Sequence, residues 1–281
     1  MEPFSPGYFR FGGTRSDLLF FQPDENSVES SHQCPPLFQY DQTLVNLRAP
    51  FEVQNITGAQ FLNIYNGIKC AGLKLIFGLN LNNRVNGQWN SDNVELLLQF
   101  IKEHDLKLTL ELGNEPNSYH HKFGYPMSPE QHMLDMSKLN DLLVKYNLSL
   151  PVFGPDSTGR SKQAYKYLDQ FIQLVPSLEA YSYHHYSLSG YSSSASDYLS
   201  TKSFRLFENE VKKWTKLTDK PLMLGETAVS YGLGLIYNLS SYLIIRGGQE
   251  GITNRWLGSF LWVDKLGLAA THGIRSVMRG N

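Results

Sequence analysis

The sequence predicts an α/β fold, a (β/α)8 TIM barrel in which one strand is unaccounted for. Short apolar runs alternate with longer runs of helical periodicity along most of the chain, which is typical of a parallel sheet whose strands are joined by helices. The chain has 281 residues, close to the ~250 residues of an ordinary barrel of this kind. We therefore expect a single barrel domain over residues 1–281.

Seven strand candidates support this prediction, at residues 9–13, 74–80, 106–112, 151–156, 179–186, 221–227 and 273–279. Helices are predicted at 91–104, from Ser128 onward, at 161–175, at 203–217 and around 255–268. Ser91 or Asp92 caps the first helix, and Ser128 followed by Pro129 is a typical helix start. Residues 22–67 have no clear period, so we expect a long irregular loop with a helix near residues 57–68.

The run at 106–112 also predicts which side chains face the barrel interior. Leucines stand at 106, 108, 110 and 112, whereas Lys107, Thr109 and Glu111 alternate with them. Because successive side chains of a strand point to opposite faces, the two sets lie on different sides of the sheet. We expect the leucines to face the outer helices and the smaller or polar residues to face the interior.

Composition argues against several classes of function. The 25 basic and 26 acidic residues leave no global charge bias, and nothing indicates nucleic-acid binding. An anionic partner would need a local basic cluster, and the two candidates are Arg160 with Lys162 and Lys166, or Lys212 with Lys213 and Lys216. Charged stretches on helices are usually solvated faces. No run reaches the ~20 apolar residues of a transmembrane segment, and the first residues lack the pattern of a signal peptide.

Other residues bear on the compartment without deciding it. Glycosylation sequons begin at Asn55, Asn147 and Asn238, and the two cysteines are Cys34 and Cys70, 36 positions apart. Sequons occur by chance, and two cysteines can equally be buried thiols. A bridge between them would add ~3 to 4 kcal/mol of stability in an oxidising compartment.

Two carboxylates give the strongest functional signal. Glu115 lies in LTLELGNEPN and Glu226 in PLMLGET, each at the end of a strand-like run. In one parallel barrel both would face the same mouth. Glycoside hydrolysis needs such a pair, one carboxyl to protonate the leaving oxygen and one to attack the sugar carbon. Either residue alone is more simply explained as a surface or helix-start glutamate, but the two together predict catalysis, with Asn114 beside the acid to hydrogen-bond a sugar hydroxyl.

Several motifs together resemble a known family. They are FRFGGTRSD, KLIFGLN followed by QWNS, LELGNEPNS, GPD at 154–156, YHHY, LGETAVSYG and WVDKLGLAATHGI followed by VMR. In this order they resemble the heparanase-like enzymes of glycoside hydrolase family 79 along nearly the whole chain. Asn-Glu-Pro alone would indicate only the wider group of barrel glycosidases.

This resemblance implies a retaining endo-β-glucuronidase that cuts heparan sulfate, with Glu115 as acid/base and Glu226 as nucleophile. It also implies substrate contacts at Thr14, Asn114, Arg160, His184, Tyr186, Tyr231 and Gly232, and a disulfide between Cys34 and Cys70. It further implies a lysosomal or secreted location. This expectation comes from the family alone, because the chain itself shows no export signal.

The same resemblance predicts differences from the family. In the family, a first barrel strand precedes the segment that matches residues 9–13, and a β-sandwich domain follows the barrel. We expect this chain to lack both, so that its barrel is incomplete. Residues 233–246 look like an insertion beside the nucleophile. A basic residue expected after YHHY aligns with Tyr191.

No metal or other cofactor is expected. His120-His121 and His184-His185 have no cysteine or carboxylate partners at ligand spacing. A histidine that hydrogen-bonds Glu226 or a sugar hydroxyl is the alternative that the residues favour over a metal ligand.

The expected mechanism places the two carboxyl groups ~5 to 5.5 Å apart and gives Glu115 the higher pKa. Two other functions stay open. One is a non-catalytic glycan-binding or regulatory fragment, and the other is an exo-acting β-glucuronidase.

Overall fold

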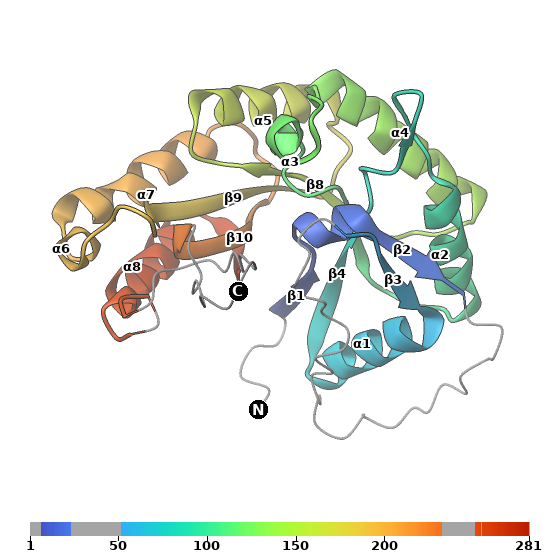
Figure 1. Ribbon diagram of the computed structural model, residues 1–281, viewed down its shortest axis with the longest axis horizontal. Helices are drawn as coiled ribbons and strands as arrows, with labels where there is room; N and C mark the ends of the chain where they lie inside the picture. The colour runs from blue at the N-terminus through green and yellow to red at the C-terminus, as the bar shows by residue number, and fades with distance from the viewer. Residues whose placement is uncertain (1–6, 24–51, 232–250, 254, 281) are drawn as a thin grey trace, which may run out of the picture.

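The computed structural model of the protein describes residues 7–23, 52–231, 251–253 and 255–280, and shows a curved parallel sheet flanked by helices (Figure 1). The strand order of the sheet is β1 (Gly7–Phe11), β4 (Leu73–Leu79), β7 (Thr109–Leu112), β8 (Val152–Thr158), β9 (Ala180–Ser189), β10 (Leu222–Tyr231) and β11 (Ile274–Arg279). Every neighbouring pair is parallel. All seven strand candidates and the α/β barrel class are confirmed.

The edge strands β1 and β11 come close to each other, so the barrel is nearly closed. Within the described part of the chain, they share no backbone ladder. These are the two edges expected when one of eight strands is unaccounted for.

Helices connect the strands and cover the outside of the sheet (Figure 1). They are α1 (Gly58–Cys70), α2 (Asp92–Glu103), α3 (Tyr119–Phe123), α4 (Pro129–Lys145), α5 (Lys162–Leu174), α6 (Ala195–Tyr198), α7 (Thr201–Trp214) and α8 (Gly258–Thr271), with 3-10 turns η1 (Thr14–Leu18) and η3 (Pro116–Ser118). The Ser128 hydroxyl accepts a hydrogen bond from the Gln131 amide at the start of α4, as predicted. Ser91 precedes α2, but the Asn90 side chain accepts the bond from the Asp92 amide there.

Strand β7 confirms the alternation expected at 106–112. Leu110 and Leu112 are buried in the main hydrophobic core between sheet and helices. Glu111 points to the opposite side, where its carboxylate meets Arg10 of β1. The barrel interior is therefore polar at this level.

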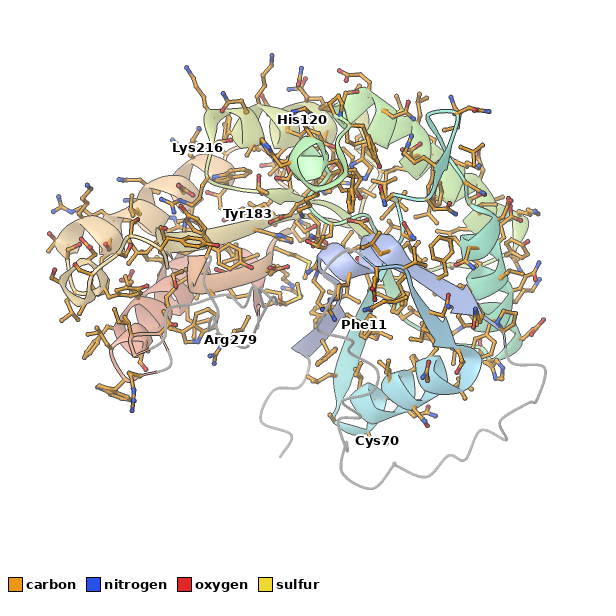
Figure 2. All side chains as sticks on the ribbon, in the orientation of Figure 1. Phe11, Cys70, His120, Tyr183, Lys216 and Arg279 are labelled. Atoms are coloured by element: carbon orange, nitrogen blue, oxygen red, sulfur yellow. The ribbon has the colours of Figure 1, made fainter. Side chains whose placement is uncertain are left out.

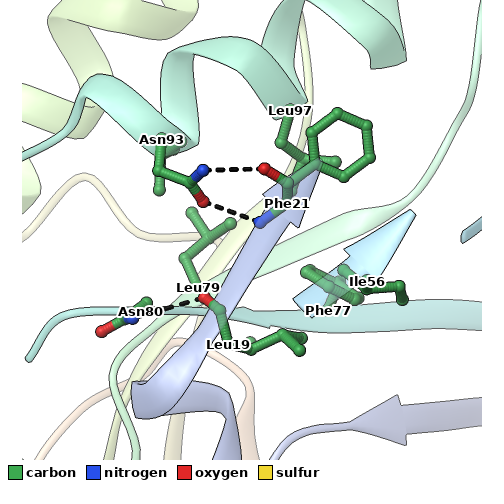
Figure 3. Close-up of a pocket in the computed structure, with 10 residues that line it drawn as sticks. Leu19, Phe21, Ile56, Phe77, Leu79, Asn80, Asn93 and Leu97 are labelled. Carbon is green, nitrogen blue, oxygen red and sulfur yellow. Dashed lines mark hydrogen bonds between the residues drawn. The ribbon is translucent and has the colours of Figure 1, made fainter. Parts of the chain in front are cut away.

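The helix expected near residues 57–68 is confirmed as α1, whereas the irregular loop expected from residue 22 is wrong at residues 54–57, which form a strand. Strand β2 (Leu19–Gln22) pairs in parallel with β3 (Gln54–Thr57), and β3 leads directly into α1. The Asn93 side chain of α2 bonds both the amide and the carbonyl of Phe21, which fixes β2 against the barrel (Figure 3). A short antiparallel pair, β5 (Arg84–Val85) with β6 (Gln88–Trp89), follows β4. The cavity in Figure 3 lies between β2, β3, β4 and α2, away from both candidate glutamates.

Several expectations fall on residues that the structure does not describe. Cys34, Gly232, Asn238 and the proposed insertion at 233–246 lie outside the described residues, so pairing of Cys34 with Cys70 stays a prediction. Asn55 and Asn147, the other two sequon asparagines, are exposed. Among the described residues, no helix has the length and apolar character needed to cross a bilayer.

Candidate active site

Charged and polar side chains converge at the carboxyl ends of the strands, where the loops of a parallel barrel normally form an active site. Glu115 follows β7, Asp156 belongs to β8, His184 and Tyr186 to β9, and Glu226 to β10. Arg10 reaches this group from β1. The two glutamates singled out in the sequence therefore lie in one site.

The backbone around Glu115 is folded tightly. Glu115 has φ 50° and ψ 57°, a left-handed conformation that costs roughly 1 to 3 kcal/mol for a residue other than glycine and is common at functional sites. The Glu115 amide donates to the Asp156 carbonyl at 2.9 Å. At Gly113, with φ 83°, a Cβ would lie 2.6 Å from a methyl carbon of Leu81. Glycine there lets the chain turn and present the Glu115 carboxylate to the mouth of the barrel.

Two cations hold the Glu115 carboxylate. Lys122 Nζ of α3 lies 2.7 Å from Oε2, and His184 Nδ1 lies 3.1 Å from Oε1. Burial alone would raise the pKa of Glu115, but the hydrogen bond from His184 and the charge of Lys122 outweigh it and lower the pKa to about 2. The raised pKa that we expected from the sequence is therefore wrong for this arrangement.

Glu226 lies opposite, where β10 is irregular. The pairing of β10 with β9 shifts register between Leu224 and Glu226, which is a β-bulge. A bulge re-aims the side chain beside it. The Tyr186 hydroxyl donates to Oε1 of Glu226, and Arg10 Nη1 lies 3.3 Å from Oε2. The Glu226 side chain keeps 25% of its surface exposed, enough to meet a substrate.

Glu115 and Glu226 both approach the imidazole of His184, which limits how far apart one oxygen of each carboxyl group can lie. His184 Nδ1 lies 3.1 Å from Glu115 Oε1 and 3.9 Å from Glu226 Oε2, and the sum of these distances places the two oxygens no more than 7.0 Å apart. Retaining glycosidases need ~5 to 5.5 Å between the carboxyl groups and inverting ones ~6.5 to 9.5 Å. Because the bound concerns one oxygen of each group, it is compatible with the retaining range and does not by itself exclude the inverting range.

Arg10 is the centre of the site, and it was not predicted from the sequence. Its guanidinium lies 2.7 Å from Glu111, 2.5 Å from Asp156 and 3.3 Å from Glu226, and it donates to Asn114 Oδ1 at 3.0 Å. Burial alone would lower the pKa of Arg10, but these carboxyl groups raise it well above its ordinary value. The available signal was a lone arginine between Phe9 and Phe11 in a run predicted to be a strand.

Glu111 and Asp156 form a pair of unequal acids below the catalytic candidates. Burial and the neighbouring Asp156 raise the pKa of Glu111 well above its usual range. Burial acts in the same direction on Asp156, but Arg10 and His184 outweigh it and lower the pKa of Asp156. Glu111 is therefore the more readily protonated of the two.

His184 is charged and joins the two halves of the site. Its Nε2 lies 3.2 Å from Asp156 Oδ1 while Nδ1 faces Glu115. Burial alone would lower the pKa of His184, but Glu226 and the bonds to Asp156 and Glu115 raise it to about 9. The expected histidine contact thus goes to Glu115 rather than to Glu226. In the described part of the chain, no group of three or more His, Cys, Asp or Glu residues could hold a metal ion.

The other candidate binding residues belong to two groups, one at the turn η1 and one that joins Arg160 to Tyr231. The Asn114 amide donates to Asp17 of η1 at 3.1 Å, and Asp17 also accepts from the Tyr119 hydroxyl at 2.6 Å. Thr14 begins the same turn. The Arg160 guanidinium lies 5.5 Å from the centre of the Tyr231 ring, so the structure brings these two candidates together.

The two basic clusters have different settings. Lys162 is the first residue of α5, and Lys166 lies one turn later, so Arg160 of the first cluster lies just before this helix. Lys212 pairs with Glu208 along α7, and Lys213 lies over the ring of Tyr165. Lys216 is exposed beyond the same helix (Figure 2). The second cluster is therefore a solvated outer face, which is the ordinary role of charged helical residues.

The comparison with protein families matches the model described as glycosyl hydrolase family 79, N-terminal domain, over residues 1–267. The chain belongs to glycosyl hydrolase family 79. The resemblance stated from the motifs is therefore confirmed.

Individual relatives show how much of a longer protein is matched. The chain is 31% identical to heparanase from Mus musculus over 309 residues, covering 98% of this chain and 55% of the relative. It is 26% identical over 322 residues to inactive heparanase-2 from Homo sapiens, covering 98% and 53%. The chain thus spans about half the length of these relatives.

A solved structure supports the fold. The 4-O-α-L-rhamnosyl-β-D-glucuronidase from Fusarium oxysporum aligns with a TM-score of 0.62 at 17% identity, covering 97% of this chain and 54% of that one. At this identity the likeness concerns the fold alone.

Proposed function

We propose that this chain carries the catalytic site of a retaining glycoside hydrolase that cleaves internal β-glucuronidic bonds of heparan sulfate. The observation that carries the proposal is the convergence of Glu115 and Glu226 on one imidazole, with two of their oxygens no more than 7.0 Å apart by the sum of 3.1 and 3.9 Å. The relationship to a protein named heparanase supports the choice of substrate.

In the first step Glu226 attacks the anomeric carbon while the bond to the leaving oxygen breaks. The Tyr186 hydroxyl and Arg10 hold the two oxygens of Glu226 in place for this attack. The electron pair of the broken bond stays with the leaving oxygen, which takes a proton from Glu115. In the second step Glu115 accepts a proton from water, whose oxygen displaces Glu226 from the sugar.

Glu115 must hold a proton before the first step. In the substrate-free arrangement Glu115 is ionised between Lys122 and His184. His184 is protonated, and its Nδ1 lies 3.1 Å from Glu115. When substrate arrives, a shift of Lys122 away from Glu115 would raise the pKa of the carboxyl group and increase its protonated fraction, while His184 remains the protonated neighbour.

Recognition of an anionic sugar is proposed for the rim of the site. Arg160 is exposed and lies over the half-exposed ring of Tyr231. A guanidinium pairs well with planar carboxylates, so Arg160 is the candidate for the sugar carboxylate or a sulfate, with Tyr231 as the neighbouring platform. Asn114 and Thr14 would bind sugar hydroxyl groups.

The direct test is digestion of heparan sulfate followed by sizing of the products. An endo-acting enzyme gives early fragments of intermediate length, whereas an exo-acting β-glucuronidase releases single sugars from the chain end. Glu226→Gln is the matched control and should abolish both. Intact polysaccharide after incubation with a folded, monodisperse wild-type chain would reject the proposal.

A second candidate function is glycan binding without turnover. The lowered pKa of Glu115 favours it, because an acid/base residue must hold a proton. One relative is also named inactive heparanase-2. Binding of heparan sulfate without cleavage, equal in the wild type and in Glu226→Gln, would support this alternative.

The location is proposed from the family relationship as lysosomal or secreted. A bridge between Cys34 and Cys70 would fit an oxidising compartment. Exposure of Asn55 and Asn147 fits glycosylation there.

A further inference from the structure

Helices α7 and α8 lie against β9 and β10 (Figure 1). Behind the candidate active site, a second buried polar cluster lies between α8 and these two strands. Its centre is Lys265 of α8, whose side chain is 1% exposed. Lysine is almost never fully buried unless it is paired. In the described part of the chain, however, no carboxylate forms an ion pair with this ammonium group, and all its polar contacts are to neutral oxygens.

These oxygens belong to the two strands that carry the candidate catalytic residues. Lys265 Nζ donates to Thr227 Oγ1 at 2.8 Å and to the Ala228 carbonyl at 2.8 Å, both in β10. It also donates to the His185 carbonyl of β9 at 3.3 Å. Thr227 directly follows Glu226, and His185 directly follows His184.

The contacts of Lys265 lie directly beyond an irregularity in the pairing of β9 with β10. The register of β9 and β10 shifts between Leu224 and Glu226, and Glu226 then pairs with His184 and Thr227 with His185. A bulge disrupts the ladder locally, so the direction of Glu226 depends on how firmly the strands are rejoined beyond it. Lys265 binds both members of the Thr227–His185 pair.

The groups around the Lys265 ammonium are an aromatic ring and charged side chains that act on it without an ion-pair contact in the described residues. From α7, the ring of Phe207 lies 5.4 Å from the ammonium, within the range of a cation–π contact. Glu210 of the same helix and Arg160 after β8 also act on it electrostatically. His185 of β9 is buried, and its Nε2 lies 3.2 Å from Glu210 Oε2.

We propose that Lys265 is a positioning residue, which fastens β9 to β10 directly behind His184 and Glu226 and so holds the Glu226 carboxylate in its attacking position. This proposal rests on the proposed glycosidase function for its kinetic readout only. Lys265 touches no substrate and takes no part in proton transfer.

Burial of the Lys265 ammonium group has a cost in folding free energy that depends on pH. Burial lowers the pKa of Lys265 to about 7, which means that the fold tolerates the ammonium at a cost. Because the pKa in the folded state is below the usual 10.5, the cost is fully present below about pH 7 and declines as pH rises toward 10.5. Lys265→Met removes this buried charge but also leaves the acceptors at Thr227, Ala228 and His185 without Lys265 as donor, so its two effects on stability oppose each other. Stability alone therefore does not reveal the role of Lys265, and kinetics must be measured.

The main experiment compares Lys265→Met with the wild type and with Lys216→Met, which removes an exposed lysine at the outer surface (Figure 2). On an aryl β-glucuronide, Lys265→Met should lower kcat by roughly 10- to 100-fold, the scale expected for a displacement of ~1 Å, with KM changed less than about threefold. All three proteins are assayed well below their melting temperatures, so that a loss of kcat cannot come from unfolding. Lys216→Met should change none of these values.

Two further measurements cover the other outcomes. If Lys265→Met does not fold, Thr227→Val must show the same selective loss of kcat, because it removes both the acceptor for Lys265 and the hydrogen bond that the Thr227 hydroxyl donates to the His185 carbonyl. If the wild type hydrolyses no glucuronide, the proposed function fails, and hydrogen exchange of the β10 amides at 226–231 decides. Faster exchange in Lys265→Met than in Lys216→Met supports the proposal, whereas unchanged exchange or an unchanged kcat overturns it.

Discussion

Replacing Lys122 by methionine tests the electrostatics of the candidate acid directly. Lys122 Nζ lies 2.7 Å from Glu115 Oε2, with 16% and 19% of the two side chains exposed. An opposite charge this close typically lowers a carboxyl pKa by roughly 1 to 3 units. The pKa of Glu115, about 2 in the wild type, should therefore rise to roughly 3 to 5 in Lys122→Met, with the contact to His184 retained.

The higher pKa of Glu115 in Lys122→Met should raise its protonated fraction and lower the free energy of unfolding. At pH 5 the protonated fraction of Glu115 should increase on the order of tenfold to several hundredfold for that shift. Because the folded pKa lies below the usual 4.5, the ionised group stabilises the fold above about pH 4.5, and this contribution is lost as pH falls through about 2. Lys122→Met should reduce the contribution by roughly 1.4 to 4 kcal/mol, at about 1.4 kcal/mol per unit.

The assay is carbon-13 NMR of the protein with labelled glutamate side chains, titrated from pH 6 downward. The Glu115 signal is assigned by its absence in Glu115→Gln. Lys102→Met, on the exposed face of α2, is the control and should leave the titration midpoint in place. A midpoint for Glu115 that is the same in Lys122→Met and in the wild type would refute the reasoning.

The remaining predictions concern the roles of single residues. A fluorosugar of the glucuronide type should label Glu226 covalently, as found by mass spectrometry of peptides, and a label on Glu115 would reverse the assigned roles. Glu115→Ala should lose far more activity on glucuronides with poor leaving groups than on activated aryl glucuronides, because only the former need a proton donor; equal losses would argue against an acid/base. Arg10→Met leaves buried carboxylates unpaired and should cost ~3 to 5 kcal/mol in urea unfolding, whereas a cost under ~1 kcal/mol would contradict the central role of the guanidinium. Non-reduced digests of secreted material should contain a peptide that joins Cys34 to Cys70, and two freely alkylated thiols would show that they are not bridged.

Local pattern was sufficient to predict most of the barrel. The seven strands are apolar runs bounded by helix starts, and the polar interior of β7 follows from strict alternation around Glu111. Strands β2 and β3 were missed because each has four residues and because they pair across an interval with no period of its own. Pairing between distant short segments depends on what covers them, here Asn93 of α2.

The candidate site could be predicted only in part for the same physical reason. Glu115 and Glu226 were found because the carboxyl ends of parallel strands all lie at the same face of a barrel. Arg10 was missed because its partners Glu111 and Glu226 lie 101 and 216 positions away, and no local pattern encodes such contacts. The direction of the Glu115 pKa shift was missed because it depends on Lys122, brought back to the carboxylate by the short turns η3 and α3.

The placement of Arg10 connects the stability of the barrel with the geometry of the site. Strand β1 is an edge strand whose described ladder is to β4 alone. Through Arg10 it also contacts Glu111 of β7, Asp156 of β8 and Glu226 of β10, across the barrel interior. Such a buried ion cluster is favourable only when every member is paired in good geometry. The arrangement that satisfies Arg10 therefore also orients Glu226, so a change that loosens β1 should disturb this proposed nucleophile even though β1 contributes no reacting group to the proposed mechanism.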